Sequence, residues 1–160
     1  MASRKRSAAT DSVPLTSPIP LDTSLDELIG YAIRRAQLKV FQHFVNKLAS
    51  HELRPAHFSA LAVIDQNPGL MQADLARALA IEPPQLVPLL DRLAARVLAV
   101  RVRCKPDKRS YGIFLSKTGE QLLKELKQLA VESDIESTDA LTVSERATLL
   151  ELLRKIYRDS

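Results

Sequence analysis

Residues 71–119 constrain the fold of this 160-residue chain more than any other stretch. Apolar residues recur at three- and four-residue intervals over residues 72–79 and again over 86–93, and a short turn separates the two runs. This spacing predicts two amphipathic helices joined by a tight turn, which is a helix-turn-helix. Two strand-like segments follow, at 97–103 and 111–115, and they predict a hairpin directly behind the second helix.

The tip of the predicted hairpin is rich in cations. On a duplex, a helix can enter the major groove while a cationic hairpin reaches phosphates or the adjacent minor groove. The pattern therefore predicts a mainly α protein with a winged helix-turn-helix, whose partner is double-stranded DNA. The hairpin residues that we expect to contact DNA are Arg103, Lys105, Asp107, Lys108, Arg109 and Ser110.

The second helix of the pair is the expected recognition helix, and it contains prolines. Gln85 can hydrogen-bond an adenine, whereas Pro84 and Pro88 offer apolar edges to thymine methyl groups. Pro88 stands inside the helix and removes an internal hydrogen bond, so it should bend or distort the helix. Gln72, at the start of the first helix, is a further candidate DNA contact. We expect modest direct base readout and strong reliance on backbone contacts and minor-groove shape.

The overall composition fits polyanion binding only mildly. The chain has 23 Lys and Arg against 19 Asp and Glu, a net charge of +4 and a pI near 9.4. Its one cysteine excludes an intrachain disulfide, and no apolar run is long enough for a membrane span or a secretory signal. We therefore expect a soluble, cytoplasmic protein without a membrane partner.

The helices that flank the predicted DNA-binding module have features of a dimer interface. Ser24 and Glu27 have the spacing of a capping box and predict the start of a long helix. Apolar residues cover more than one face of that helix, so one face should pack on its own domain and the other on a second copy of the chain. Thr142 and Glu145 form another capping box ahead of an amphipathic last helix. The N- and C-terminal helices are thus expected to form a dimerisation platform.

The chain is expected to divide into four segments. Residues 1–22 contain basic residues and prolines without periodicity, so we expect a disordered tail, with a basic arm that attracts phosphates as the alternative. Residues 23–52 are the predicted N-terminal dimerisation and ligand helix, and residues 53–117 the winged-helix DNA-binding domain. Residues 118–160 are the predicted C-terminal dimerisation helices.

Cations are concentrated within two turns of the predicted first helix. Such a cluster is most often a solvated face. Beside aromatic residues, however, it can form the rim of a pocket for an anionic, partly apolar ligand. The candidate ligand-binding residues are Arg34, Arg35, Lys39, Phe41, His43, Phe44 and Phe58.

The stretch from about residue 53 to residue 119 resembles the multiple-antibiotic-resistance regulator (MarR) family of winged-helix transcription factors. The matching pieces are QADLARAL from Gln72, LDRL from Leu90, DKRS from Asp107 and LSKTG from Leu115. The flanking helices fit the dimerisation elements of the family. The chain departs from the family at Val97, where a glycine is usual; because a β-branched residue disfavours the left-handed conformation, we expect the local turn to differ.

The resemblance implies a homodimer on a pseudo-palindromic operator, usually repressing and often released by a small aromatic or anionic effector. It also implies that Arg109 is the wing arginine that enters the minor groove and that Asp107 orients it. Relatives with a basic, aromatic-bearing first helix include regulators that respond to hydroxycinnamoyl-coenzyme A thioesters. Such an aromatic acyl-CoA thioester is one candidate effector, and a free phenolic acid is the other.

Other functions have less support in the sequence. No nucleophile with a neighbouring base, phosphate loop or metal motif is visible, so we expect no enzyme activity, no metal and no cofactor. A winged helix that mainly binds another protein is encouraged only by the prolines of the recognition helix. Cys104 has no second cysteine to resolve a sulfenic acid, so a redox role has little support.

Overall fold

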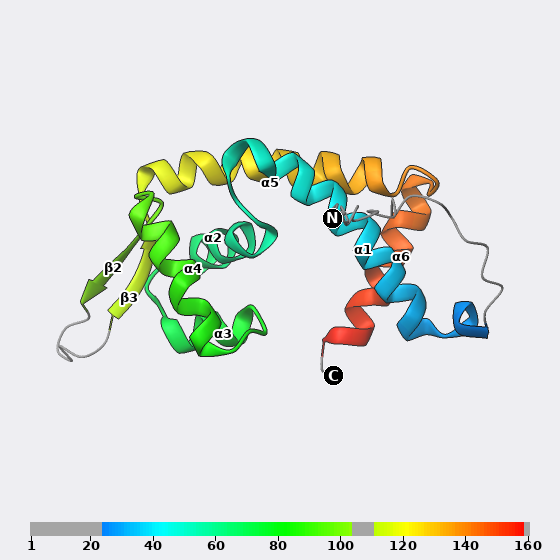
Figure 1. Cartoon of the computed structure of the whole chain (residues 1–160), viewed down its shortest axis with the longest axis horizontal. Coiled ribbons are helices and arrows are strands. Elements are labelled where there is room, and N and C mark those ends of the chain that lie inside the picture. Colours follow the sequence, from blue (N-terminus) through cyan, green and yellow to red (C-terminus); the bar gives the residue numbers. More distant parts are fainter. Residues whose placement is uncertain (1–23, 104–110, 159–160) are drawn as a thin grey trace, which may run out of the picture.

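The computed structural model describes residues 24–103 and 111–158 (Figure 1). Within these residues the chain forms six α-helices, three strands and two short 3-10 turns. The helices are α1 (Ile29–Leu48), α2 (Pro55–Gln66), α3 (Gln72–Ala78), α4 (Pro83–Ala95), α5 (Lys117–Ser137) and α6 (Val143–Tyr157). The strands are β1 (Leu70–Met71), β2 (Ala99–Arg103) and β3 (Tyr111–Leu115), and the 3-10 turns are Ser24–Glu27 and Ala49–His51. The predicted mainly α winged helix-turn-helix is confirmed.

The sheet is small and antiparallel, with strand order β1-β3-β2. Strands β2 and β3 form the predicted hairpin, in a register that pairs Arg103 with Tyr111. Sequence reasoning missed β1, because two residues are too short to show an alternating pattern. Gly112 lets β1 approach, since a Cβ at this position would lie 2.9 Å from the carbonyl oxygen of Gly69. The extra strand anchors the loop between α2 and α3 to the wing.

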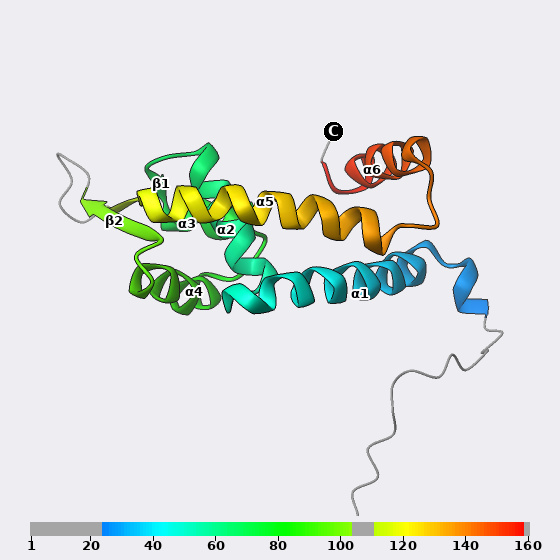
Figure 2. The same cartoon turned by 90° about the horizontal axis from the view of Figure 1, so that it is seen from above.

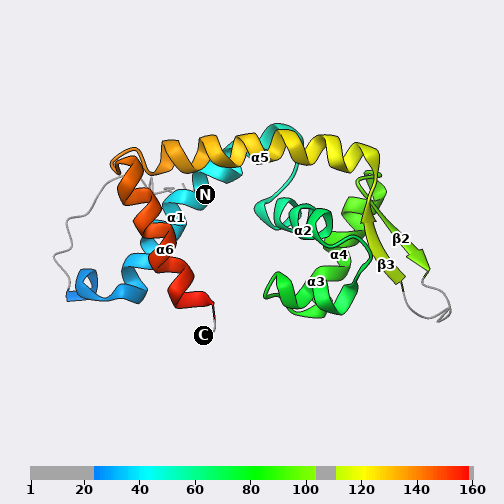
Figure 3. The same ribbon diagram turned by 180° about the vertical axis from the view of Figure 1, so that it is seen from behind.

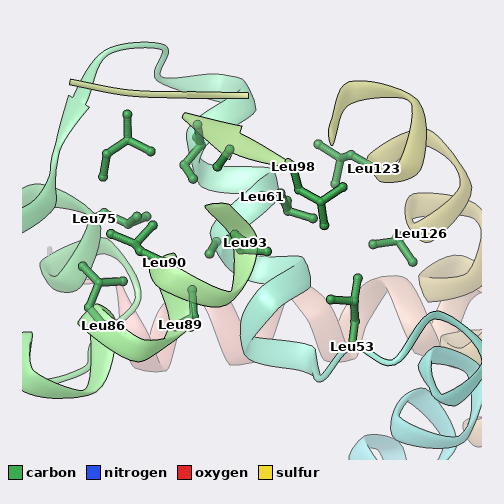
Figure 4. Packing of buried hydrophobic residues seen from close by; sticks show 14 of the residues in the cluster. Leu53, Leu61, Leu75, Leu86, Leu89, Leu90, Leu93, Leu98, Leu123 and Leu126 are labelled. Carbon is green, nitrogen blue, oxygen red and sulfur yellow. The ribbon is translucent and has the colours of Figure 1, made fainter. Parts of the chain in front are cut away.

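A leucine-rich core joins the helix-turn-helix, the sheet and α5 (Figure 4). Leu61 of α2, Leu75 of α3 and Leu93 of α4 are fully buried, and Leu98 lies beside them at the start of the wing. Leu123 and Leu126 of α5 close the core from the far side. Each such leucine stabilises the fold by roughly 1.5 to 3 kcal/mol relative to an exposed one, so this core fixes α4 in place.

Helix α5 connects two ends of an elongated molecule. Its first half covers the winged-helix module, and its second half runs alongside α1, as the views from above and behind show (Figures 2 and 3). Lys47 of α1 binds this second half through Glu136 at 2.7 Å and Glu132 at 3.6 Å. Helix α6 then turns back beneath the same end. The molecule therefore has two ends. One is the winged-helix module of α2 to α4, the sheet and the first half of α5, which we call the DNA-binding end after its predicted role. The other is an arm made of α1, the second half of α5, and α6.

The prediction that Ser24 begins the long first helix was wrong. Residues Ser24–Glu27 form a 3-10 turn, which the amide of Leu28 closes by donating to the carbonyl of Leu25. Leu28 is extended (φ −90°, ψ 121°), so α1 begins only at Ile29. A local turn that satisfies its own backbone competes with helix initiation, which the residue spacing alone does not reveal. The capping box of Thr142 and Glu145 at the start of α6 is confirmed.

The predicted change of the turn at Val97 was also wrong. Val97 adopts the left-handed conformation (φ 56°) that glycine usually supplies. Its amide donates to Ala94 and that of Leu98 to Leu93, which is a Schellman end for α4. Ser116 donates to the Val97 carbonyl, and Gly119 lies so close that a Cβ there would clash with the carbonyl oxygen of Leu98. Packing of the start of α5 on this turn thus overrides the local preference of valine.

Candidate DNA-binding surface and ligand hollow

The recognition helix α4 has a buried face and an exposed face. Leu86, Leu89, Leu90 and Leu93 face the core. The sequence-predicted base contacts Pro84, Gln85 and Pro88 are all exposed, so the structure brings them to the surface of one helix. Gln72 is half-buried at the first position of α3. Helix α4 continues through Pro88, and the bend expected there stays a prediction.

An ion pair that sequence reasoning missed connects α4 to the wing. A terminal nitrogen of Arg101 on β2 lies 2.9 Å from Oδ1 of Asp91 on α4. Because Arg101 pairs in register with the buried Ile113, this face of β2 looks toward the core and α4. The partners are ten residues apart and belong to different elements, so helical or strand spacing gives no sign of the contact. The pair adds a polar contact between the wing and the recognition helix, although exposed ion pairs stabilise a fold only weakly.

Arg103 is held at the base of the wing by Tyr111. The Nε of Arg103 donates to the Tyr111 hydroxyl at 2.8 Å, and the guanidinium carbon lies 5.6 Å from the ring centroid. Both side chains are exposed. A guanidinium held at one edge can still bind a phosphate with its other edge. Tyr111 is a second residue that sequence reasoning missed, since its role depends on the strand register.

The tip of the wing lies outside the described residues. This holds for Lys105, Asp107, Lys108, Arg109 and Ser110, and also for Cys104. The minor-groove role of Arg109 and the orienting role of Asp107 therefore stay predictions.

The three cations predicted for ligand binding lie exposed on α1, but in different surroundings. Nη1 of Arg35 donates to the Tyr31 hydroxyl at 3.1 Å, and this hydrogen bond raises the pKa of Arg35 above its ordinary value. Nζ of Lys39 lies 3.9 Å from Oδ1 of Asp139 in the loop before α6. Arg34 points to solvent, and His43 is half-buried on the same helix. Arg34 is thus the cation best placed to meet an incoming anion.

An apolar hollow of about 200 Å³ lies where α1 meets the helix-turn-helix. Phe41 of α1 forms one wall and is 49% exposed. Arg34 is seven residues earlier, which places it on the same face of α1 and roughly 10 Å away along the helix. The residues that line the hollow are Phe41, Pro55, Ala56, Ser59, Leu79 and Ile81.

Phe44 and Phe58 lie elsewhere. Their rings form an edge-to-face pair with centroids 5.1 Å apart, half-buried against the leucine core. Neither ring lines the hollow below Phe41. Of the three phenylalanines predicted to enclose a ligand, the structure brings only Phe41 to this hollow.

Two findings bear on other kinds of site. In residues 24–103 and 111–158, no three His, Cys, Asp or Glu side chains lie close enough to hold a metal ion. Over the same ranges, none of the helices combines the length and apolar character needed to cross a bilayer.

The helix-turn-helix, the hairpin behind it and the helix α5 that covers them define a winged-helix DNA-binding protein. Residues 51–110 match the model of the MarR family. One relative is the putative transcriptional regulatory protein for the hcr operon of Thauera aromatica. It is 30% identical to this chain over 148 residues, which cover 87% of this chain and 89% of the relative. The chain belongs to the MarR family of transcriptional regulators. Since the members compared are regulators, the chain is a regulator and not an enzyme.

Two solved structures of the transcriptional repressor CouR are similar over most of their length. CouR bound to a 23-mer DNA duplex is 41% identical, with a TM-score of 0.79 over 84% of this chain and 95% of CouR. CouR bound to p-coumaroyl-CoA is 38% identical, with a TM-score of 0.75 over 85% of this chain and 96% of CouR. One fold thus accommodates a duplex and an acyl-CoA thioester in that repressor.

Proposed function

We propose that the protein is a homodimeric repressor that binds a pseudo-palindromic operator and leaves it when a small anionic aromatic effector binds. The observation that carries this proposal is the position of the hollow. One wall belongs to α1 of the arm, and Leu79 and Ile81 of the other wall belong to the helix-turn-helix. A ligand seated there touches both parts, so it can change the distance between them.

The arm supports the dimer. In the described part of the chain, α6 has no buried residue, although it is an amphipathic helix. Large apolar side chains are exposed along it, at Val143, Leu149, Leu150, Leu152, Ile156 and Tyr157. Such a face needs a cover, and Ile29, Ile33 and Leu38 of α1 are exposed at the same end of the molecule. A second copy supplies a matching apolar surface by symmetry.

The dimer places two recognition helices on one duplex. Each would present Pro84, Gln85 and Pro88 to a major groove, while Arg103 and the wing residues 105–110 would meet phosphates and the minor groove. Gln72 at the start of α3 would add a contact to the DNA backbone. The two helices must match half-sites about one helical turn apart, so affinity depends on the spacing within the dimer.

We favour an aromatic acyl-CoA thioester as the effector. Its ring would enter the hollow below Phe41, and its phosphates would follow the face of α1 that carries Arg34, with Arg35 and Lys39 beside it. His43, on the same helix as Arg34 and Phe41, would be a further candidate contact, whereas the Phe44–Phe58 pair packs against the leucine core and would not touch the ligand. The binding of p-coumaroyl-CoA by CouR supports this assignment. A free phenolic acid would fill the hollow but would need only one cation.

The effector is tested by titration into the operator complex. An operator is first selected from random duplexes, and its fluorescence anisotropy is followed while p-coumaroyl-CoA, coenzyme A or p-coumarate is added. We expect release by the thioester at a far lower concentration than by either part alone. In the variant Arg34→Gln/Arg35→Gln/Lys39→Gln, release should need much more thioester, whereas the variant Lys124→Gln on α5 should respond like the parent.

Other outcomes identify other effectors. If p-coumarate releases the operator and the thioester does not, and if the parent and the triple variant need the same concentration of p-coumarate, the effector is a free phenolic acid. Release of the triple variant at the thioester concentration of the parent would make the α1 cations a solvated face. A parent protein that selects no duplex at all would contradict the proposed function.

A further inference from the structure

Arg92 of the recognition helix and Arg96 at its C-cap reach back to the turn that follows α1. Nη2 of Arg92 donates to the carbonyl oxygen of Glu52 at 2.9 Å, and Nη1 of Arg96 donates to that of His51 at 2.7 Å. The arginines are four residues apart, so Arg96 follows Arg92 by about one turn at the end of α4. Their acceptors are 40 and 45 residues earlier in the chain. These two bonds therefore join distant segments at the boundary between the arm and the DNA-binding end.

The acceptors are well suited to guanidinium groups. Helix α1 ends at Leu48 and is followed by the 3-10 turn Ala49–His51, so His51 and Glu52 lie where a helix exposes unpaired carbonyl groups. Hydrogen bonds from a charged donor to such groups are stronger than neutral ones, and the negative end of the helix dipole adds to them. Both arginines thus have a physical reason to stay bound to this turn.

The turn itself moves with α1. Glu52 is held in the left-handed conformation (φ 53°), and the amides of Glu52 and Leu53 donate to the carbonyls of Ala49 and Leu48. Leu48 and Leu53 on either side are buried. Helices α1 and α4 otherwise have little direct contact. The two arginine hydrogen bonds therefore give the end of α1 a direct polar connection to α4, beside the packing through α2 and the leucine core.

The side chain of His57 lies near Arg92 at the same boundary. Its Nδ1 accepts a hydrogen bond from the amide of Arg54 at 3.1 Å, which caps the start of α2. Burial, assisted by the charge of Arg92, lowers the pKa of His57 below its ordinary value. The lowered pKa favours the neutral imidazole, so His57 adds little positive charge beside the guanidinium of Arg92.

Arg92 also stands close to the DNA-facing residues. It follows Pro88 by four positions and Gln85 by seven, so it continues their row along α4. Its position on the helix alone would suggest a phosphate contact, but its guanidinium donates to the carbonyl oxygen of Glu52 in the turn after α1. We propose that Arg92 and Arg96 are positioning residues, which set the angle of the recognition helix from the end of α1 and so fix the half-site spacing that the dimer accepts. This inference rests on the proposed dimeric function.

The test compares operators of different spacing. The selected operator is prepared with its half-sites as found and with one base pair added or removed between them. The parent should prefer the selected spacing. In the variant Arg92→Gln/Arg96→Gln, we expect at least a tenfold loss of affinity for the selected operator and a smaller loss for the two altered operators. The ratio of the affinities for the selected and altered spacings should therefore decrease. The variant Arg92→Lys/Arg96→Lys, which keeps both charges and a donor, should regain part of the preference and serves if the glutamine variant does not fold.

Salt dependence separates positioning from a phosphate contact. A residue that binds a phosphate contributes about 0.9 to the slope of log affinity against log salt, whereas a positioning residue contributes nothing. We expect the slope of the double variant to equal those of the parent and of Lys124→Gln, whose exposed lysine lies on α5 and not on the recognition helix. A lowered slope, an equal loss on every spacing, or binding like the parent would overturn the inference. A parent that selects no duplex would instead overturn the proposed function on which it rests.

Discussion

The two ends of the molecule are built from similar leucine-rich helices but differ in what those leucines contact. Leu61, Leu75 and Leu93 at the DNA-binding end are fully buried within one chain. In the arm, Leu149, Leu150 and Leu152 of α6 are 40 to 52% exposed. The DNA-binding end therefore buries its leucine core within one chain, whereas the arm leaves large apolar side chains exposed. In the proposed dimer, folding and assembly would depend on different ends of the molecule.

The same substitution at both ends should break this comparison most directly. Leu61→Ala leaves a cavity in the core and should lower the free energy of unfolding by about 2 to 5 kcal/mol. Leu152→Ala should instead weaken self-association, with an effect that diminishes at high protein concentration. Urea unfolding at several protein concentrations and sedimentation measure the two effects. A parent protein that stays monomeric in sedimentation would contradict the proposed dimer.

The wing should affect DNA binding without affecting either fold or assembly. If Arg109 enters the minor groove, Arg109→Ala should reduce operator affinity by about 1 to 3 kcal/mol. Lys105→Ala and Lys108→Ala should have smaller effects and mainly reduce the salt slope, because they remove phosphate contacts. Anisotropy titrations at several salt concentrations distinguish these cases. Unchanged binding by a folded Arg109→Ala variant would refute the assignment.

A substitution in the turn after the recognition helix should stabilise the protein, whereas Leu61→Ala should destabilise it. Val97→Gly relieves a strained left-handed valine, and we expect a gain in the free energy of unfolding of up to about 1 kcal/mol after the entropy of glycine in the unfolded chain is counted. The side chain is exposed, so little packing is lost. Thermal unfolding of the two proteins measures the change. Destabilisation would mean that the valine side chain has contacts in the dimer.

The pH dependence should give the smallest effect and should arise at the DNA-binding end. The pKa of His57 lies below its ordinary value of 6.5, chiefly because the side chain is buried. As the pH falls below 6.5, the unfolded chain takes up a proton that the folded protein refuses, so stability decreases until the folded pKa is passed. His57→Gln retains an acceptor for the Arg54 amide and should flatten this part of the profile. An unchanged profile would place the titrating group elsewhere.

Much of the fold could be predicted from local patterns. The intervals between leucines revealed both helices of the helix-turn-helix, and the capping residues Thr142 and Glu145 revealed the start of α6. The strand β1 was too short to show a pattern, and the conformation of Val97 depends on Ser116 and Gly119, which approach only in the folded chain. Local preference is decisive only where no distant contact opposes it.

The candidate site was predictable to a smaller extent. Pro84, Gln85 and Pro88 are exposed and Phe41 lines a hollow, so these residues are accessible, while their roles in DNA and ligand binding stay predictions. The pairing of Arg103 with Tyr111 follows from the register of β2 and β3. The hydrogen bonds of Arg92 and Arg96 join residues that are 40 and 45 positions apart in the sequence. A charge count could identify these arginines as cations but could not tell a DNA contact from an internal one. Their hydrogen-bond partners make that distinction.

The length of α5 has a mechanical consequence. It is one unbroken helix of 21 residues, roughly 32 Å long, and it is held by α1 at one end and by the wing core at the other. A rod of that length works as a lever: a tilt of about 5° at the arm carries the opposite end through about 3 Å. That displacement is close to the rise of one base pair. On the proposed function, we expect substitutions near the buried Ser133 and Ser137, at the arm end of α5, to change which operator spacing the protein accepts.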